Sequence, residues 1–330
     1  MRPATLLATL LVITACAAPP PEPPPGTARP SGAWFGQPEP GLAPAVFAPG
    51  VVSTGRFERD LAWTPDGRQA FWTVYAPAER HGMIVTSRQL DDGSWSAPEI
   101  PPMFVGHNSL EPFVTPDGAW LYFASTRPLP GESDPGDWNL WRAPRDGEAW
   151  GEPEPLPPPI SGDGDEYYPS LTRDGRLVFT AEREGSLGGE DLWSSHETAG
   201  GWSEPENLGA AVNSAGPEFN SLIHPGGDWI LFGSARAGDS GGGDLYVSFV
   251  TPDGWSPAQA LAAPLNSAAL DFCPALSPDG ELLFFSSRRS LGDPAAATSY
   301  DELAALLDGP GNGQSDLFWV RAEVLEPYRP

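Results

Sequence analysis

Short apolar runs alternate with tight turns along most of the chain. A turn of the type Thr-Pro-Asp-Gly, or close to it, recurs five times; proline presets φ at the second position and glycine accepts a positive φ at the fourth. An apolar run rich in aromatic and branched residues follows each turn, which is typical of a β-strand leaving a hairpin. The turns end at Gly67, Gly118, Gly175, Gly227 and Gly280, and the runs cover residues 69–74, 120–124, 177–181, 229–233 and 282–286.

The turns mark an internal repeat. Successive turn glycines are 51, 57, 52 and 53 residues apart, and two further short strands keep the same phase. Four strands in a unit of about 50 residues are typical of a propeller blade. We therefore predict an all-β fold, a single β-propeller of about five four-stranded blades, with six blades as the alternative. The third strands begin at Asn139, Asp191, Asp244 and Asp316, and the fourth strands begin at Trp95, Trp150, Trp202 and Trp255.

The ends of the repeat indicate how the ring closes. The last blade has no tryptophan strand behind residues 316–321, and the segment that begins at Trp34 has no blade of its own. Pairing this N-terminal strand into the last blade would remove an open sheet edge. The propeller domain is thus predicted to span residues 33–330.

The N-terminal segment is typical of a secreted lipoprotein. Residues 1–15 contain Arg2 and an apolar run too short to span a bilayer, which predicts a signal peptide. Residues Ile13 to Cys16 resemble the bacterial lipobox, with Cys16 as the lipidated residue; the alternative is an ordinary secretory signal with an incidental cysteine. Residues 16–32 are rich in proline and predict a semi-rigid tether. Ala17 favours the outer membrane, facing the periplasm, with the lipid as the only membrane attachment.

Composition excludes several functions. The chain has 44 acidic and 18 basic residues, all of the latter arginine, for a formal charge of −26. A surface this acidic repels nucleic acid and anionic lipid. The absence of lysine excludes Schiff-base chemistry. Cys273 is the only cysteine besides Cys16, so no disulfide is expected within the mature chain, and its apolar neighbours predict a buried position.

The fullest repeat, from Asn207 to Tyr246, resembles the WD-like propeller repeat of TolB and related periplasmic lipoproteins. It contains Asn-Leu-Gly, Asn-Ser, a glutamate, a glycine-rich turn, an arginine and Asp-Leu-Tyr in that order. The resemblance implies a propeller fold, and the same repeat occurs in scaffolds, receptors and regulatory domains of peptidases. TolB has six blades and a preceding α/β domain, and neither is evident here, so the resemblance does not extend to a role in the Tol complex.

Acidic residues precede the inner strands at a nearly constant phase. Blade topology places these positions near one mouth of the central channel, together with the histidine of the Gly-His-Asn-Ser segment. Such a face could bind a cation or a basic peptide. The alternative is that each acid bonds backbone groups or an arginine of the next blade. The candidate residues are Glu58, His107, Glu111, Glu166, Glu218 and Asp271.

One loop breaks the repeat. Most blades use 8 to 12 residues between the arginine after the second strand and the start of the third strand, whereas Arg288 and Asp316 are 28 apart. The loop contains Ser-Tyr-Asp-Glu at 299–302, which predicts a capped helix that stops at residues 308–310. We expect Tyr300 and Leu303 to contact a partner, because long loops of rigid scaffolds often carry function. The alternative is a lid that packs on the blade.

The sequence predicts no catalytic residue, metal ligand or cofactor. It contains no Gly-x-Ser-x-Gly motif, and its four histidines are far apart. The leading hypothesis is a monomeric, non-enzymatic envelope propeller that binds a protein or peptide. The alternative is a propeller that binds or cleaves glycans. A pair of carboxylates facing an open, aromatic-lined pocket would favour the alternative, and a channel plugged by paired side chains would favour binding.

Overall fold

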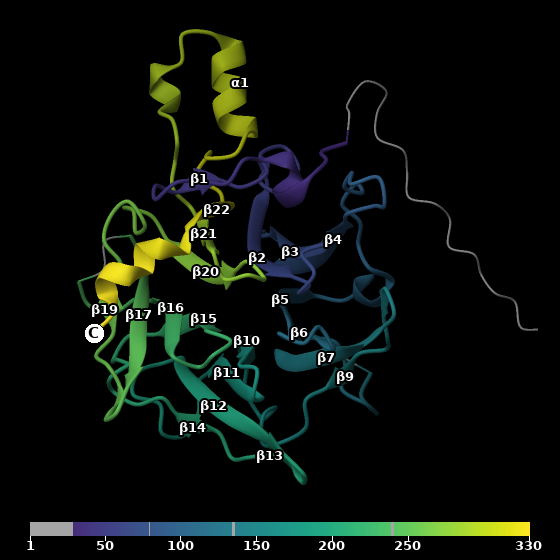
Figure 1. Cartoon of the computed structure of the whole chain (residues 1–330), viewed down its shortest axis with the longest axis vertical. Coiled ribbons are helices and arrows are strands. Elements are labelled where there is room, and N and C mark those ends of the chain that lie inside the picture. Colours follow the sequence, from purple (N-terminus) through teal and green to yellow (C-terminus); the bar gives the residue numbers. More distant parts are fainter. Residues whose placement is uncertain (1–28, 79, 134–135, 239–240) are drawn as a thin grey trace, which may run out of the picture.

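The computed structural model is a ring of five antiparallel sheets around a central axis, so the prediction of a five-bladed propeller is confirmed (Figure 1). It describes residues 29–78, 80–133, 136–238 and 241–330. In every blade the first strand lies innermost and the third or fourth lies outermost. Among the described residues, no helix has the length and apolar character needed to cross a membrane.

The five blades follow one another along the chain. Blade one contains β2 (Phe57–Trp63), β3 (Gln69–Ala76) and β4 (His81–Arg88). Blade two contains β5 (Ser109–Val114), β6 (Trp120–Ser125), β7 (Asn139–Asp146), β8 (Ala149–Trp150) and β9 (Glu154–Pro155). Blade three contains β10 (Glu166–Leu171), β11 (Arg176–Ala181), β12 (Asp191–Thr198), β13 (Gly201–Trp202) and β14 (Glu206–Asn207). Blade four contains β15 (Glu218–Ile223), β16 (Trp229–Ser234), β17 (Asp244–Thr251), β18 (Gly254–Trp255) and β19 (Gln259–Ala260). Blade five contains β20 (Asp271–Leu276), β21 (Leu282–Ser287), β22 (Asp316–Arg321) and β1 (Ala45–Val46).

The outer strands are shorter than the sequence suggests. In blades two, three and four the tryptophan segment forms two separate two-residue pieces, both paired with the third strand. In blade one the same region makes only the isolated bridges Gln89–Trp95 and Thr86–Glu99. Prolines follow each tryptophan within three residues and cannot donate a ladder hydrogen bond, which interrupts the strand.

An N-terminal strand closes the ring, as predicted, but it is not the strand at Trp34. The closing strand is β1, which pairs Ala45 with Trp319 and Val46 with Phe318. Residues Ala33–Gly36 instead form the 3-10 turn η1, with Trp34 and Phe35 at positive φ. The prolines at 38 and 40 disfavour a paired strand there.

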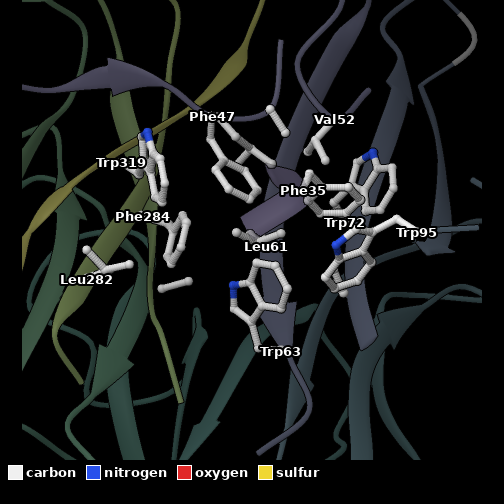
Figure 2. Close-up of a cluster of buried hydrophobic side chains, with 14 of the residues drawn as sticks. Phe35, Phe47, Val52, Leu61, Trp63, Trp72, Trp95, Leu282, Phe284 and Trp319 are labelled. Atoms are coloured by element: carbon white, nitrogen blue, oxygen red, sulfur yellow. The ribbon is translucent and has the colours of Figure 1, made fainter. Parts of the chain in front are cut away.

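The aromatic side chains of η1 fill the seam between blades five and one (Figure 2). Phe35 stacks on Trp95 with ring centroids 4.2 Å apart, and Trp34 meets the edge of Trp63 at 5.1 Å. The preceding residues also contact blade one, where the Gly32 carbonyl accepts a 2.8 Å hydrogen bond from the Trp95 indole. The N-terminal segment therefore closes the last sheet and packs against the first.

Every inner strand carries a β-bulge at the same phase. Seven residues before each turn glycine, one non-glycine residue adopts a positive φ between 48° and 62°. A bulge bends the strand and redirects one side chain. These five residues come together at the axis of the ring: Asp60, Glu111, Tyr168, Asn220 and Cys273.

Besides η1, four short helices lie outside the sheets among the described residues. They are η2 (Pro102–Phe104), η3 (Pro294–Ala296), α1 (Tyr300–Asp308) and η4 (Ala322–Tyr328). η4 follows blade five and reaches blade four, where the Tyr328 hydroxyl accepts a 2.6 Å hydrogen bond from the Ala262 N–H. The α1 segment stands off the ring beyond β1 and β22 (Figure 1).

Candidate functional site

A buried polar network occupies the axis of the propeller. Glu111 accepts hydrogen bonds from Arg59 Nη2 at 2.7 Å, from the Tyr168 N–H at 2.7 Å and from Asn220 Nδ2 at 3.2 Å. The Arg59 guanidinium also donates to Asp60 Oδ1 at 2.7 Å and lies over the Phe272 ring. The channel is therefore plugged by paired side chains from several blades.

Burial dominates the electrostatics of this network. Burial raises the pKa of Glu111 to about 8, against the opposing effect of the Arg59 charge. Burial also raises the pKa of the Cys273 thiol and of the Tyr168 phenol, whose hydroxyl donates to the Pro274 carbonyl at 3.0 Å. All three side chains are buried, with Cys273 fully so.

The bulge position, seven residues before each turn glycine, differs from the rest of the repeat. At the turns and at the start of the inner strands the same chemical type recurs, whereas the bulge holds five different residues. A position with a purely structural role would be expected to hold the same type of residue in every blade. Of the five, sequence reasoning selected only Glu111 as a site residue and treated Cys273 as core. The constant offset of seven residues from the turn glycine is the signal that would have found the others.

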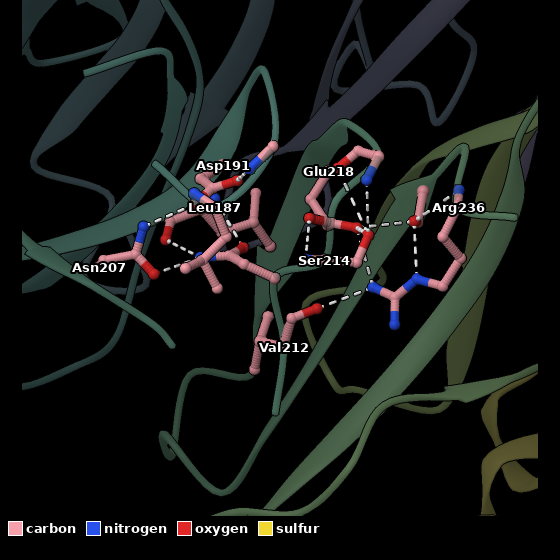
Figure 3. Close-up of polar contacts among 12 residues, drawn as sticks. Leu187, Asp191, Asn207, Val212, Ser214, Glu218 and Arg236 are labelled. Atoms are coloured by element: carbon pink, nitrogen blue, oxygen red, sulfur yellow. Dashed lines mark hydrogen bonds and ion pairs between the residues drawn. The ribbon is translucent and has the colours of Figure 1, made fainter. Parts of the chain in front are cut away.

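The other four predicted acids brace their own blades. Figure 3 shows Glu218, whose carboxylate accepts from the Ser214 N–H at 2.7 Å, from the Ser214 hydroxyl at 2.6 Å and from Arg236 Nη2 at 3.0 Å. Glu166 with Arg183 and Asp271 with Arg289 repeat this arrangement at 2.8 and 2.7 Å, and Glu58 accepts from Thr54. These contacts match the bracing interpretation, except that each arginine comes from the same blade and not the next.

In blades three, four and five the arginine pairs with the inner-strand acid and not with the aspartate that starts the third strand. In blade three that aspartate, Asp191, accepts from the Leu187 N–H and from the Asn207 side chain, both at 2.7 Å (Figure 3). In blade five the pairing residue is Arg289, one position after the arginine assigned from the sequence.

Blade two departs from this brace. Ser109 stands where the other blades have an acid, and Arg127 instead lies between the rings of Phe123 and Trp141. Burial lowers the pKa of Arg127 to about 10. His107 lies on the same loop side, where burial and the Arg127 charge lower its pKa, so its ring is neutral at pH 7.

The long insert forms an arm, which we define as residues 290–312. Ser290 and Asn312 pair at its base, and Asn312 Nδ2 donates to the Gly55 carbonyl at 3.1 Å. The predicted capped helix is present: Ser299 accepts from the Glu302 N–H at 3.2 Å, and Glu302 accepts from Thr298. Helix α1 buries no side chain and packs against η3 of the same arm. Tyr300 is 81% exposed and Leu303 is half-buried, so the arm does not form a lid.

A hollow of about 120 Å³ opens on the face that carries the Pro-Asp-Gly turns, opposite the inner-strand acids. Its floor includes Glu111 and Tyr168, and its walls are mainly proline, leucine and aromatic side chains. Glu111 is the one carboxylate among the described residues that line it. Within the described ranges, no group of three histidine, cysteine or acidic side chains is placed to hold a metal ion.

Comparison with known proteins does not name a family. No family model and no curated protein matches the chain. A putative TolB from Agrobacterium tumefaciens is 18% identical, with a TM-score of 0.48 over 81% of this chain and 90% of that one. An α-L-arabinofuranosidase from Lactobacillus brevis is 14% identical, with a TM-score of 0.46 over 82% and 92%. A further one, from Podospora anserina, is 13% identical, with a TM-score of 0.46 over 86% and 94%. At these identities the likenesses concern the fold alone.

Proposed function

We propose that this chain is a non-enzymatic propeller of the bacterial cell envelope that docks a partner protein through its arm. The single observation that carries the proposal is an ordered, capped helix that buries no side chain in its own domain. Ordering a loop costs conformational entropy, and here little burial within the domain offsets that cost. A partner that covers the helix would supply the missing burial.

The arm has the composition of a docking element for a basic surface. It exposes Tyr300, Leu307 and Leu291, which are 81%, 50% and 57% accessible. Residues 290–315 contain four acids and no basic residue. An apolar helix with acidic flanks complements a partner whose apolar groove is edged by arginine or lysine. The partner we propose is an envelope protein or peptide segment of that chemistry, bound to a propeller that is itself monomeric.

In the hollow on the turn face, the arrangement of carboxylates favours binding over glycan cleavage. Glycosidases of the common type need two carboxyl groups flanking the bond to be cleaved. Only Glu111 lines the hollow among its described residues, and the neighbouring Asp60 is bonded to Arg59. Arg59 also pairs with Glu111, so the channel is of the plugged kind.

The anchor is the second part of the proposal. Cys16 lies outside the described residues, and its assignment as the lipidated residue depends on the lipobox resemblance at 13–16. We place the chain on the outer membrane, facing the periplasm, with the lipid as its membrane attachment. A proline-rich segment ahead of the propeller would hold the arm away from the lipid surface.

Replacement of the arm tests the docking role. The Leu291 N–H donates to the Gly311 carbonyl at 2.9 Å, so an Asn-Gly turn can join these residues in place of residues 292–310 and keep the Gly311 N–H that Asp316 accepts. Because α1 buries no side chain, the melting temperature should change by no more than a few degrees, while affinity capture of the partner from envelope extracts should be lost.

The matched control is Leu187→Ser, which removes a 50% exposed leucine from a different blade. It should leave both stability and capture unchanged. Capture that survives replacement of the arm, or cleavage of an arabinoside by the purified protein, would contradict the proposal.

A further inference from the structure

The walls and the floor of the hollow on the turn face differ in their chemistry. Its walls are apolar, and its floor is chemically saturated because Glu111 and Tyr168 already bond within the axial network. A volume near 120 Å³ has room for about one apolar side chain of a ligand. Such a side chain would gain by leaving water for the apolar part of the lining.

Arg173 is the one basic residue among the described residues that line this hollow. It lies at the lip, on the turn of blade three, at the position where the other four blades have Pro65, Pro116, Pro225 and Pro278. The Arg173 N–H donates to the Pro225 carbonyl at 2.9 Å, so the backbone still joins the neighbouring blade. Arg173 therefore places a positive charge at a lip where the other four blades have proline.

The Arg173 side chain differs from the bracing arginines. Arg183, Arg236 and Arg289 each pair with a buried acid at 3.0 Å or less. Arg173 is exposed, and no ion pair within the described ranges involves it, although the chain has 44 acids. Its guanidinium is thus free to pair with an anionic group from outside the chain.

We infer that the hollow binds the C-terminal end of an apolar peptide, with the terminal carboxylate on Arg173 and the last side chain inside. Guanidinium and carboxylate match in geometry and charge. The acidic surface around the lip repels ligands that carry several negative charges, which favours a single carboxylate on an apolar body.

This site lies on a different surface from the arm, so the two proposals can fail separately, although both assume a binding role. The test uses the purified full chain with Cys16→Ser, so that no acyl chain competes for the hollow. The probes are the acetylated tripeptide Ala-Leu-Phe with a free carboxylate, the same tripeptide as its C-terminal amide, and decanoate. Isothermal titration calorimetry measures each Kd.

The free tripeptide should bind about tenfold or more tightly than its amide, and Arg173→Gln should remove that preference. The matched control is Arg176→Gln, which removes an arginine from the same hairpin that does not line the hollow and should leave the preference intact. Decanoate that binds as well as the tripeptide would overturn the peptide assignment. Absence of binding by all three probes, or equal losses from both arginine variants, would overturn the site.

Discussion

At the scale of single residues, the structure separates two uses of acidic side chains that look alike in the sequence. Glu58, Glu166, Glu218 and Asp271 hold the entry of an inner strand to the loop before it. Glu111, two positions further along its strand, joins the axial network instead. The recurrence of the bracing acids suggested either a binding face or a structural brace, and their contacts are those of a brace. The axial contacts could not be predicted, because they depend on bulges that bring residues more than 50 positions apart together.

The brace in blade four gives a stability prediction. Glu218→Ala would leave the Arg236 guanidinium without its acid and Ser214 without its acceptor. Removing one partner of a buried pair costs about 3 kcal/mol or more. Chemical denaturation should show this loss. Blade two is the natural reference, because Ser109 stands there at the position of the acid. A loss of less than about 0.5 kcal/mol in the free energy of unfolding would mean that the brace is dispensable.

Asp316 gives a prediction of pH dependence. It is fully buried, its Oδ2 accepts from the Gly311 N–H at 2.7 Å, and burial raises its pKa from 3.8 to about 7. The folded state therefore holds a proton that the unfolded state releases above pH 4. Stability should fall as the pH rises from about 4 to 7 and then level off.

Asp316→Asn should remove part of that decline, by about 1–3 kcal/mol between pH 5 and pH 8, in urea denaturation at the two values. The same slope in both proteins would show that other groups, such as Glu166 with its pKa raised by burial to about 7, account for the whole effect.

At the scale of elements, the closing strand shows where pattern reading succeeds and where it fails. The tryptophan-less last blade correctly predicted an N-terminal strand, because a missing strand leaves an open edge. The choice of Trp34 was wrong, because its aromatic side chains suggested a strand while the prolines that follow exclude one. The pairing segment, Ala45–Val46, has only two residues and no distinctive pattern.

Deletion of residues 33–46 should expose the edge of β22 and cause aggregation, measured by size-exclusion chromatography with light scattering. The double variant Trp34→Ala, Phe35→Ala keeps β1 and removes only the aromatic seam. It should remain monomeric but melt at a lower temperature, because Phe35 is buried against Trp95. A deletion that stays monomeric with an unchanged melting temperature would contradict closure by β1.

At the scale of the whole molecule, counting the repeats predicted the ring because a similar turn sequence recurs in each blade. Departures from the repeat, namely Arg173 in place of proline and the insert before Asp316, are visible in the sequence and contribute the two candidate binding surfaces. Their placement could not be predicted. The arm projects from the ring instead of bordering the channel, and the hollow opens on the face that holds the turns.

The anchor gives a prediction for the intact protein in its cell. Cys16→Ser should prevent lipidation, and the protein should leave the membrane fraction in detergent phase separation. The wild-type chain should partition with the detergent. A Cys16→Ser protein that still partitions with the detergent would show that Cys16 is not the anchor.

The most direct test of the docking account is site-specific photocrosslinking in living cells, with the crosslinking residue placed at position 300 or, as the control, at position 187. Both positions are exposed, at 81% and 50%, so neither substitution should disturb folding. The account predicts one discrete adduct from position 300, weakened by Asp301→Lys, and none from position 187. No adduct from position 300, or the same adducts from both positions, would contradict it.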